Sequence, residues 1–254
     1  MAARPWYTLV VAEEPRLIDI MNAGKMNERA RSRAASRAFG EARRLYRPAC
    51  TTEDYRAGFR LLRRAAALGH ADAHEWLGAM YDYGLGTRPN RRLALRHYKI
   101  AANAGSPNGE YHVGVFYHEG IGVRRDYKIA VSWLRKAVSH GDAEAMHLLG
   151  QCYRFGRGVP KNTKRGFALE LEAARRGVTE AQFSVGVCFS RGEGVPADPK
   201  EALKRYLKAA RKGHRDAAYN AACLYEAGRG VRQNPERAKY WYARSKELRK
   251  HCGT

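Results

Sequence analysis

Cysteine and histidine are the side chains in this sequence best suited to metal or redox chemistry, but their spacing gives them no shared site. The five cysteines lie far apart, at Cys50, Cys152, Cys188, Cys223 and Cys252. A zinc site needs ligands clustered at short spacing, and neither a Cys-x-x-Cys nor a His-Glu-x-x-His motif occurs. An odd number of cysteines without a framework of pairs is typical of a reducing compartment. We therefore predict free thiols, no bound metal or cofactor, and a cytoplasmic protein.

Glycine pairs separated by one residue are the second pattern with chemical potential, because glycine-rich loops can bind phosphate groups. None of these pairs precedes Lys-Ser or Lys-Thr, and each ends a helical pattern instead of following a strand. The sequence also lacks a Ser-x-x-Lys motif and a nucleophile elbow, and no pair of carboxylates stands out as an acid–base couple. We therefore predict a protein that is not an enzyme. The pairs are Gly84/Gly86, Gly120/Gly122, Gly156/Gly158, Gly192/Gly194 and Gly228/Gly230.

Basic side chains recur shortly after these glycine pairs, in a chain whose formal net charge is +22. Lysine at the start of a helix opposes the helix macrodipole, so helix stability does not explain it. A ladder of charges about 10 Å apart, from helix-packing distances, could follow a phosphate backbone or an acidic helix. The alternative is a solvated edge with no ligand. We call these residues the basic rim: Arg88, Arg92, Arg124, Arg125, Lys128, Lys161, Lys164 and Lys200.

These patterns share one period, because the chain repeats itself every 36 residues. Gly150 has counterparts at Gly78, Gly114 and Gly186, and the glycine pairs and an aromatic position near Tyr153 recur in the same register. Periods between about 20 and 50 residues are typical of solenoids, in which each unit packs on its neighbours. The sequence therefore predicts stacked repeats.

Each repeat is predicted to hold two helices. The first begins at an N-cap such as Asp142 and buries one face made of Ala145, Leu149, Gly150 and Tyr153. The glycine pair then ends this helix, because glycine adopts positive φ without steric cost. The second helix has a small residue near its start and a small pair near its end. Stacked repeats would bury both faces, with Gly150 where a neighbouring helix comes close.

This pattern resembles the Sel-1-like repeat family, a relative of the tetratricopeptide repeats. The family motif A-x3-L-G-x2-Y-x2-G-x-G-V is met at every position from Ala145 to Val159. Trp133 and Trp241 fill an aromatic position of the second half, and His97 departs from it. The resemblance covers roughly residues 57 to 246. It implies an all-α, right-handed α-solenoid of antiparallel helix pairs with a 36-residue repeat, which binds other proteins.

The resemblance also implies that a partner lies along the concave face of the solenoid. We take this face to be the flank of the first helices formed by positions three before and four after the buried glycine. Aromatic rings on it would give a large contact area and act as hot spots, unless they pack between adjacent repeats. We call the predicted binding residues the first-helix face: Glu75, Trp76, Asp82, Tyr111, His118, His147, Arg154, Phe183 and Tyr219.

The ends of the chain depart from the pattern. Residues 1–27 are predicted to be an arm of uncertain structure, in which Glu13 and Glu14 break an apolar run too short for a good signal peptide. Residues 28–69 are interpreted as a degenerate opening repeat, and its arginine-rich start could instead be an RNA- or membrane-binding arm. The solenoid proper covers residues 70–246. Residues 247–254 would be a fraying tail, because Ser245 and Lys246 replace the small pair.

Together these features predict an adaptor or scaffold that binds a protein or peptide in the groove, and the net charge makes an acidic partner one option. The alternative is a nucleic-acid-associated protein that uses the basic rim. Phosphate binding would weaken steeply and linearly with the logarithm of salt concentration, whereas an aromatic groove contact would not. No apolar run approaches the roughly 18 residues that a membrane span needs. The oligomeric state stays open.

Overall fold

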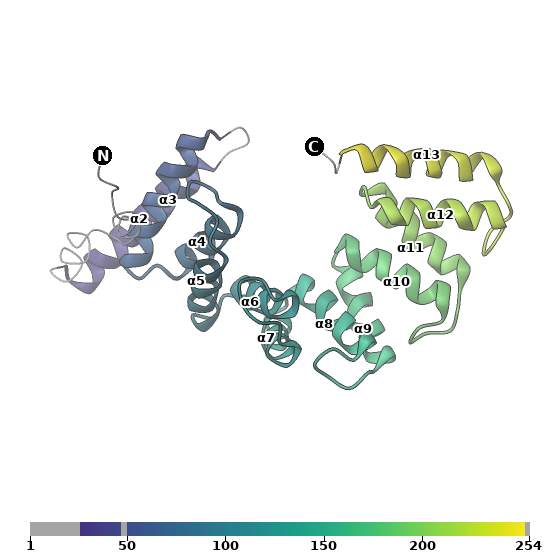
Figure 1. The fold of residues 1–254 in the computed structure, drawn as a ribbon, viewed down its shortest axis with the longest axis horizontal. Coiled ribbons are helices and arrows are strands. Elements are labelled where there is room, and N and C mark those ends of the chain that lie inside the picture. The colour runs from purple at the N-terminus through teal and green to yellow at the C-terminus, as the bar shows by residue number, and fades with distance from the viewer. Residues whose placement is uncertain (1–25, 47–49, 252–254) are drawn as a thin grey trace, which may run out of the picture. The chain divides into compact units, whose positions relative to one another are not determined.

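The computed structural model describes residues 26–46 and 50–251, and every regular element in that part of the chain is an α-helix (Figure 1). The predicted all-α fold, with helix pairs repeating every 36 residues, is therefore confirmed. The helices are α2 (Glu28–Leu45), α3 (Thr52–Ala67), α4 (Ala71–Tyr83), α5 (Arg91–Asn103), α6 (Pro107–Glu119), α7 (Tyr127–Ser139), α8 (Ala143–Phe155), α9 (Thr163–Arg175), α10 (Thr179–Arg191), α11 (Pro199–Arg211), α12 (Arg215–Ala227) and α13 (Pro235–His251).

The chain divides into two compact units. Unit 1 comprises the described residues up to Val113 together with Ile121–Val123. Unit 2 comprises Gly114–Gly120 and the described residues from Arg124 onward. Unit 1 thus contains α2 to α5 and the start of α6, and unit 2 contains the hairpins α8–α9, α10–α11 and α12–α13.

Helix α8 shows how the repeat sequence sets the ends of its first helix. The Asp142 carboxylate accepts a hydrogen bond from the Ala145 backbone N–H at 2.7 Å, which satisfies one unpaired donor of the first turn. At the other end Gly156 takes a left-handed conformation with φ 71° and donates to the Cys152 carbonyl. Between them Leu149 and Gly150 are buried, as predicted. Local chemistry therefore defines this helix before any packing does.

The second glycine of each pair has a role that the sequence did not reveal. In unit 2, a Cβ added to Gly158 would collide with the backbone of Tyr127 and Lys128, at the start of the preceding repeat's second helix. In unit 1, a Cβ on Gly86 would collide with the Tyr55 carbonyl of α3 in the same way. Each turn is therefore pressed onto the previous repeat, and glycine permits both the positive φ and the close approach.

The core between the hairpins of unit 2 is built largely from alanine. Ala173 and Ala174 of α9 are buried against Val185 of α10, and Ala209 and Ala210 repeat the arrangement in α11. Small side chains let adjacent helices approach closely, so the predicted small pair at the end of each second helix is a packing surface.

The two ends of the described chain are helical. At the N-terminal end α2 packs against α3, within the segment predicted to be a degenerate opening repeat, and a capping box between Thr51 and Asp54 starts α3. Residues 1–25 of the predicted arm lie outside the described residues, and Asn27 is the N-cap of α2. At the other end α13 runs to His251, so the predicted tail is helical over residues 247–251. No helix in the described part is both long and apolar enough to cross a membrane.

Candidate functional site

In unit 1, two members of the first-helix face are engaged by neighbouring helices. The Glu75 carboxylate accepts hydrogen bonds from Ser106 Oγ and Asn108 Nδ2, both at 2.6 Å, and so ties α4 to the start of α6. The Trp76 ring lies 5.1 Å from the ring of Tyr46, between centroids. Both side chains therefore connect successive repeats of unit 1, and both residues are half-buried.

The remaining unit 1 members are half-buried. Burial raises the pKa of Asp82, and the ring of Tyr111 lies tilted against the ring of His112 at 5.3 Å. Between Trp76 and His112 lies a cavity of about 240 Å³, which is below the roughly 300–1,000 Å³ of small-molecule sites. This part of the face therefore offers a shallow hollow with an apolar floor.

In unit 2, the structure corrects the prediction that His118 and Arg154 lie on the surface. His118 is 3% exposed, with Nδ1 2.6 Å from Glu119 Oε1 and its ring edge against Tyr127. Arg154 is 5% exposed, because α9 covers it. Both occupy the position four after the buried glycine, and in these two repeats that side chain faces the second helix of its own repeat.

Arg154 is the centre of a buried ionic cluster in the α8–α9 hairpin. Its Nη1 donates to both carboxylate oxygens of Glu170, at 3.2 and 3.0 Å, and its Nη2 donates to Glu193 Oε2 at 2.6 Å. Glu170 is fully buried, and His147 Nδ1 lies 3.7 Å from its Oε1. Burial raises the pKa of Glu170 to about 7 and lowers the pKa of His147 to about 4.

Glu170 was not among the predicted residues, although a sequence signal existed. It occupies the repeat position held by Tyr98, Leu134 and Tyr206 in other repeats, so it replaces an apolar side chain with a carboxylate. In those repeats the apolar side chain covers the buried glycine of the first helix, as Tyr206 covers Gly186. Comparing the repeats position by position would have singled it out.

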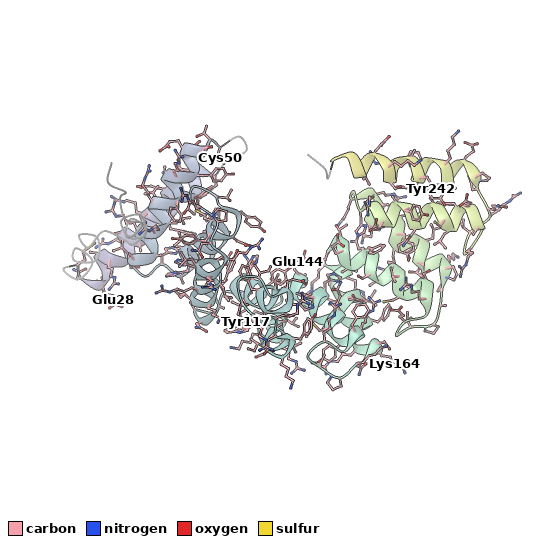
Figure 2. The ribbon with its side chains drawn as sticks, viewed as in Figure 1. Glu28, Cys50, Tyr117, Glu144, Lys164 and Tyr242 are labelled. Carbon is pink, nitrogen blue, oxygen red and sulfur yellow. The ribbon has the colours of Figure 1, made fainter. Side chains whose placement is uncertain are left out.

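Two aromatic members of the first-helix face in unit 2 differ in exposure. The Phe183 ring stacks on His214 at 4.3 Å, at the start of α12, and lies tilted on Tyr206 at 5.9 Å. Phe183 therefore packs at the joint between repeats, which is the alternative left open for these rings. Tyr219 is 53% exposed, and the edge of one ring meets the face of the other where it contacts Tyr242, labelled in Figure 2.

The basic rim is exposed at every position, as the sequence predicted. Figure 2 labels Lys164, which lies in the first turn of α9 after the glycine turn. Arg125 Nη2 donates to the Glu119 carbonyl at 3.2 Å. The other rim side chains have no ion-pair partner among the residues that the structure describes. The rim therefore carries uncompensated positive charge.

Metal and thiol chemistry find no support in the described part of the chain. No group of His, Cys, Asp and Glu side chains there could hold a metal ion. The cysteines among the described residues are free, and Cys252 lies outside them. Burial raises the pKa of Cys152 to about 11 and that of Cys188 to about 12, so both stay protonated near neutral pH.

The segments of this chain that match a known protein family follow the same 36-residue register as its helices. The family model of the Sel1 repeat matches six consecutive segments, which begin at the end of α2 and continue into α13. The comparison with curated proteins found no match. The matched residues are 44–70, 71–106, 107–142, 143–178, 179–214 and 215–249.

Several solved structures are similar to this chain. A Sel1 repeat protein from Oxalobacter formigenes is 28% identical with a TM-score of 0.74, over 84% of this chain and 82% of that one. The protein c5321, a protective antigen present in uropathogenic Escherichia coli strains, is 28% identical with a TM-score of 0.76. That match covers 88% of this chain and 49% of c5321, so the chain spans about half of it. The immunity protein Pa5087 from Pseudomonas aeruginosa, at 22% identity and a TM-score of 0.55, shares the fold.

Proposed function

The chain belongs to the Sel1 repeat family, and we propose that it is a non-enzymatic scaffold whose repeats bind a segment of another protein. Repeats of this kind present side chains at fixed intervals along a surface, and such surfaces are suited to extended partners. A cytoplasmic location is part of the same proposal. Its basis is the pattern of unpaired cysteines, and the thiol measurement in the Discussion tests it.

The exposed ring of Tyr219 carries this proposal. It occupies the repeat position that holds Glu75, Tyr111, His147 and Phe183 in the other repeats, so its chemistry is not set by the repeat motif. Unlike Phe183, it leaves more than half of its surface in water. A rigid aromatic side chain with a polar tip gives a large contact area at low entropic cost, which makes it a good anchor for a partner.

Site-specific photo-cross-linking tests the proposal. A photoreactive amino acid at position 219 should capture a protein from a lysate of the source organism. The same group at position 240 is the matched control, because Tyr240 is equally large and 61% exposed, on α13. Nuclease treatment should leave the cross-link at position 219 unchanged.

The proposal also requires binding that weakens far less between about 0.05 and 0.2 M salt than phosphate contacts do, which lose orders of magnitude in affinity over that range. Equal capture at positions 219 and 240 would argue against a specific face around Tyr219. Loss of the cross-linked product after nuclease treatment would favour a nucleic-acid partner on the basic rim.

A further inference from the structure

A ladder of alternating cationic and aromatic side chains lies at the glycine turn of the α8–α9 hairpin in unit 2. The Arg125 guanidinium lies 5.8 Å from the centroid of the Tyr127 ring, and the Arg157 guanidinium lies 5.8 Å from the same ring. Arg157 is also 5.3 Å from the Phe155 ring, which in turn lies 5.1 Å from the Arg154 guanidinium. Every neighbouring pair is within the roughly 6 Å at which cation–π attraction acts.

The fold holds this ladder in place at both ends. Arg154 is fixed by its buried bonds to Glu170 and Glu193, as described above. The contact of Gly158 with the backbone at Tyr127 presses the turn of one repeat onto the first turn of α7. The ladder therefore combines side chains from two repeats without depending on flexible loops to bring them together.

The outer part of the ladder is open to solvent and to a ligand. Phe155 is 54% exposed, and Arg125 and Arg157 are exposed with no carboxylate partner among the described residues. Basic rim residues surround it: the Lys128 backbone contacts the same glycine, and Lys161 lies against Gly156.

The acidic groups near the ladder are already engaged. The Asp126 carboxylate caps α7 by accepting from the backbone N–H groups of Lys128 and Ile129, at 2.9 and 3.0 Å. The Glu119 carboxylate contacts His118, as described above. The positive charge on Arg125 and Arg157 is therefore left for a ligand to balance.

We propose that the ladder of Arg125, Tyr127, Phe155 and Arg157 is a docking surface for an acidic protein segment that also carries aromatic or apolar side chains. A guanidinium that lies on a ring keeps its fork of N–H groups at the edge, where it can bind a carboxylate through two hydrogen bonds. Little further ordering is required, because the stacking already restricts the arginine. Phe155 supplies the apolar contact between the charges.

The extent of the charged surface favours a short acidic segment over a nucleic acid. Non-specific strand binding needs a basic groove that follows several nucleotides. At the repeat position of Arg157, the next repeat has Glu193, which pairs with Arg154 and Arg191. Ile121 holds that position in the preceding repeat. The run of arginines at this one repeat position is therefore interrupted on both sides along the sequence, and a short protein segment fits the ladder better than a nucleic-acid strand does.

Fluorescence anisotropy with a labelled peptide of alternating glutamate and tryptophan tests this inference. The wild-type chain should bind the peptide, and the Arg125→Ala/Arg157→Ala variant should bind at least about tenfold more weakly, equivalent to about 1.4 kcal/mol. The matched control is Arg229→Ala/Arg232→Ala. It also removes two exposed arginines from a glycine turn, where neither contacts a ring of any described residue, and it should bind within about twofold of wild type.

Two milder variants keep the test valid if the double variant does not fold. Phe155→Ala removes an exposed ring, and Arg157→Lys keeps the charge but loses the planar fork, so each should weaken peptide binding about threefold or more. Circular dichroism melting of each variant confirms that the fold persists. The proposal would be overturned if both folded variants bound the peptide as tightly as the wild-type chain does.

Three other results would overturn it as well. The first is an equal loss of binding in the Arg229→Ala/Arg232→Ala control, because the effect would then be diffuse charge. The second is equal affinity for a peptide of alternating glutamate and serine, which would exclude the rings. The third is tighter binding of poly(U) RNA than of the peptide, lost in the Arg125→Ala/Arg157→Ala variant.

The inference rests on the proposed function, because it assumes a protein partner. The cross-link at position 219 would survive its failure, so the two can be told apart.

Discussion

Two adjacent hairpins of unit 2 hold the same backbone together with opposite chemistry. In α10–α11 the ring of Tyr206 covers the buried glycine Gly186, and a Cβ on that glycine would lie 2.7 Å from the ring. In α8–α9 the equivalent glycine is Gly150, and Glu170 takes the place of the ring. A fully buried carboxylate paired with Arg154 thus stands where its neighbour has an apolar contact.

The difference extends to the distance between the helices. Gly166 replaces the alanine found at position 202, so in α8–α9 a glycine stands on both sides of the crossing. A Cβ on Gly150 would lie 2.9 Å from the Gly166 carbonyl oxygen, which is backbone and cannot move aside. A buried ion pair is weak evidence for stability, because removing both charges from water offsets most of their attraction. The hairpin gains instead a fixed arginine, which anchors the ladder at the glycine turn.

The largest effect should follow from breaking the ion pair. Glu170→Leu removes the carboxyl group that accepts both hydrogen bonds from Nη1 of Arg154, and leaving a buried guanidinium without this partner typically costs about 3–5 kcal/mol of unfolding free energy. Urea denaturation monitored by circular dichroism measures it. Tyr206→Phe at the same position of the next hairpin removes only a hydroxyl group and should cost about 1 kcal/mol.

The double variant Arg154→Met/Glu170→Leu separates a missing partner from a missing interaction. Apolar residues of similar volume should recover most of the stability lost in Glu170→Leu, because the guanidinium that Glu170 leaves without a partner is removed as well. If the double variant were as unstable as the single one, the ion pair itself would be the main stabilising contact of the hairpin. Glu170 and Tyr206 would then both act as stabilising contacts in their hairpins.

Substituting the buried glycine of the first helix should give a smaller difference in stability between the two hairpins. Gly150→Ala places a methyl group against backbone, and overpacking of this kind costs about 1–3 kcal/mol. Gly186→Ala meets the Tyr206 ring, which can shift, so it should cost less. Midpoints of thermal unfolding for the two variants decide the point. An unchanged midpoint for Gly150→Ala would mean that α8 and α9 do not cross at this residue.

His147 in the α8–α9 hairpin should make the stability of the protein depend on pH. Burial lowers the pKa of His147 from 6.5 to about 4, so the unfolded chain binds a proton before the folded chain does. Stability is therefore lost as the pH falls from about 6.5 to about 4. His147→Gln should remove this loss and gain about 1–2 kcal/mol on wild type at pH near 5, with little gain at pH near 7.

In wild type and in His147→Gln, Glu170 has the opposite effect on how stability depends on pH. Burial raises its pKa to about 7 from 4.5, so the folded chain keeps a proton that the unfolded chain releases, and stability rises as the pH falls through that range. This contribution is present in both proteins, so it cancels in the difference between their unfolding free energies. Urea denaturation at the two pH values measures that difference. Phe183→Leu, at the equivalent position of α10, should show no such pH dependence. The same gain at both pH values would show that His147 does not titrate on unfolding.

The smallest effect concerns the thiols, which should change reactivity and not stability. Cys152 and Cys188 occupy one repeat position in the two hairpins, and burial keeps both protonated. In the native protein the half-buried Cys50 and Cys223 should react with a thiol reagent first. Mass spectrometry of protein prepared without oxidant should find all the cysteines free. An intramolecular disulfide would contradict both this expectation and the proposed cytoplasmic location.

Features set by residues within one helical turn were predictable from the sequence, whereas burial that depends on a second helix was not. Asp142 as an N-cap and Gly156 as a helix end depend on residues within one turn, so their spacing was enough. Arg154 was expected to be exposed because its own helix gives no reason to bury it. Its burial depends on Glu170, which another helix supplies.

The aromatic positions illustrate the same limit. Phe183 and Tyr219 share a repeat position, and the sequence could not tell them apart. Phe183 is covered by His214 of the following repeat, whereas Tyr219 contacts Tyr242 of its own repeat and stays 53% exposed. The exposure of a side chain at this position depends on which side chains neighbouring helices place against it, which the residue itself does not encode.

The pressing of each glycine turn onto the preceding repeat restricts how such a chain can change its length during evolution. Gly158 and Gly194 meet the backbone at Tyr127 and Thr163, so one glycine per turn is measured against the repeat before it. A single inserted residue between the helices would move that glycine off its contact and disturb two repeats at once. Duplication or deletion of a complete 36-residue segment restores every contact. The turn thus fixes the spacing between successive repeats, and the gene can grow or shrink by whole repeats.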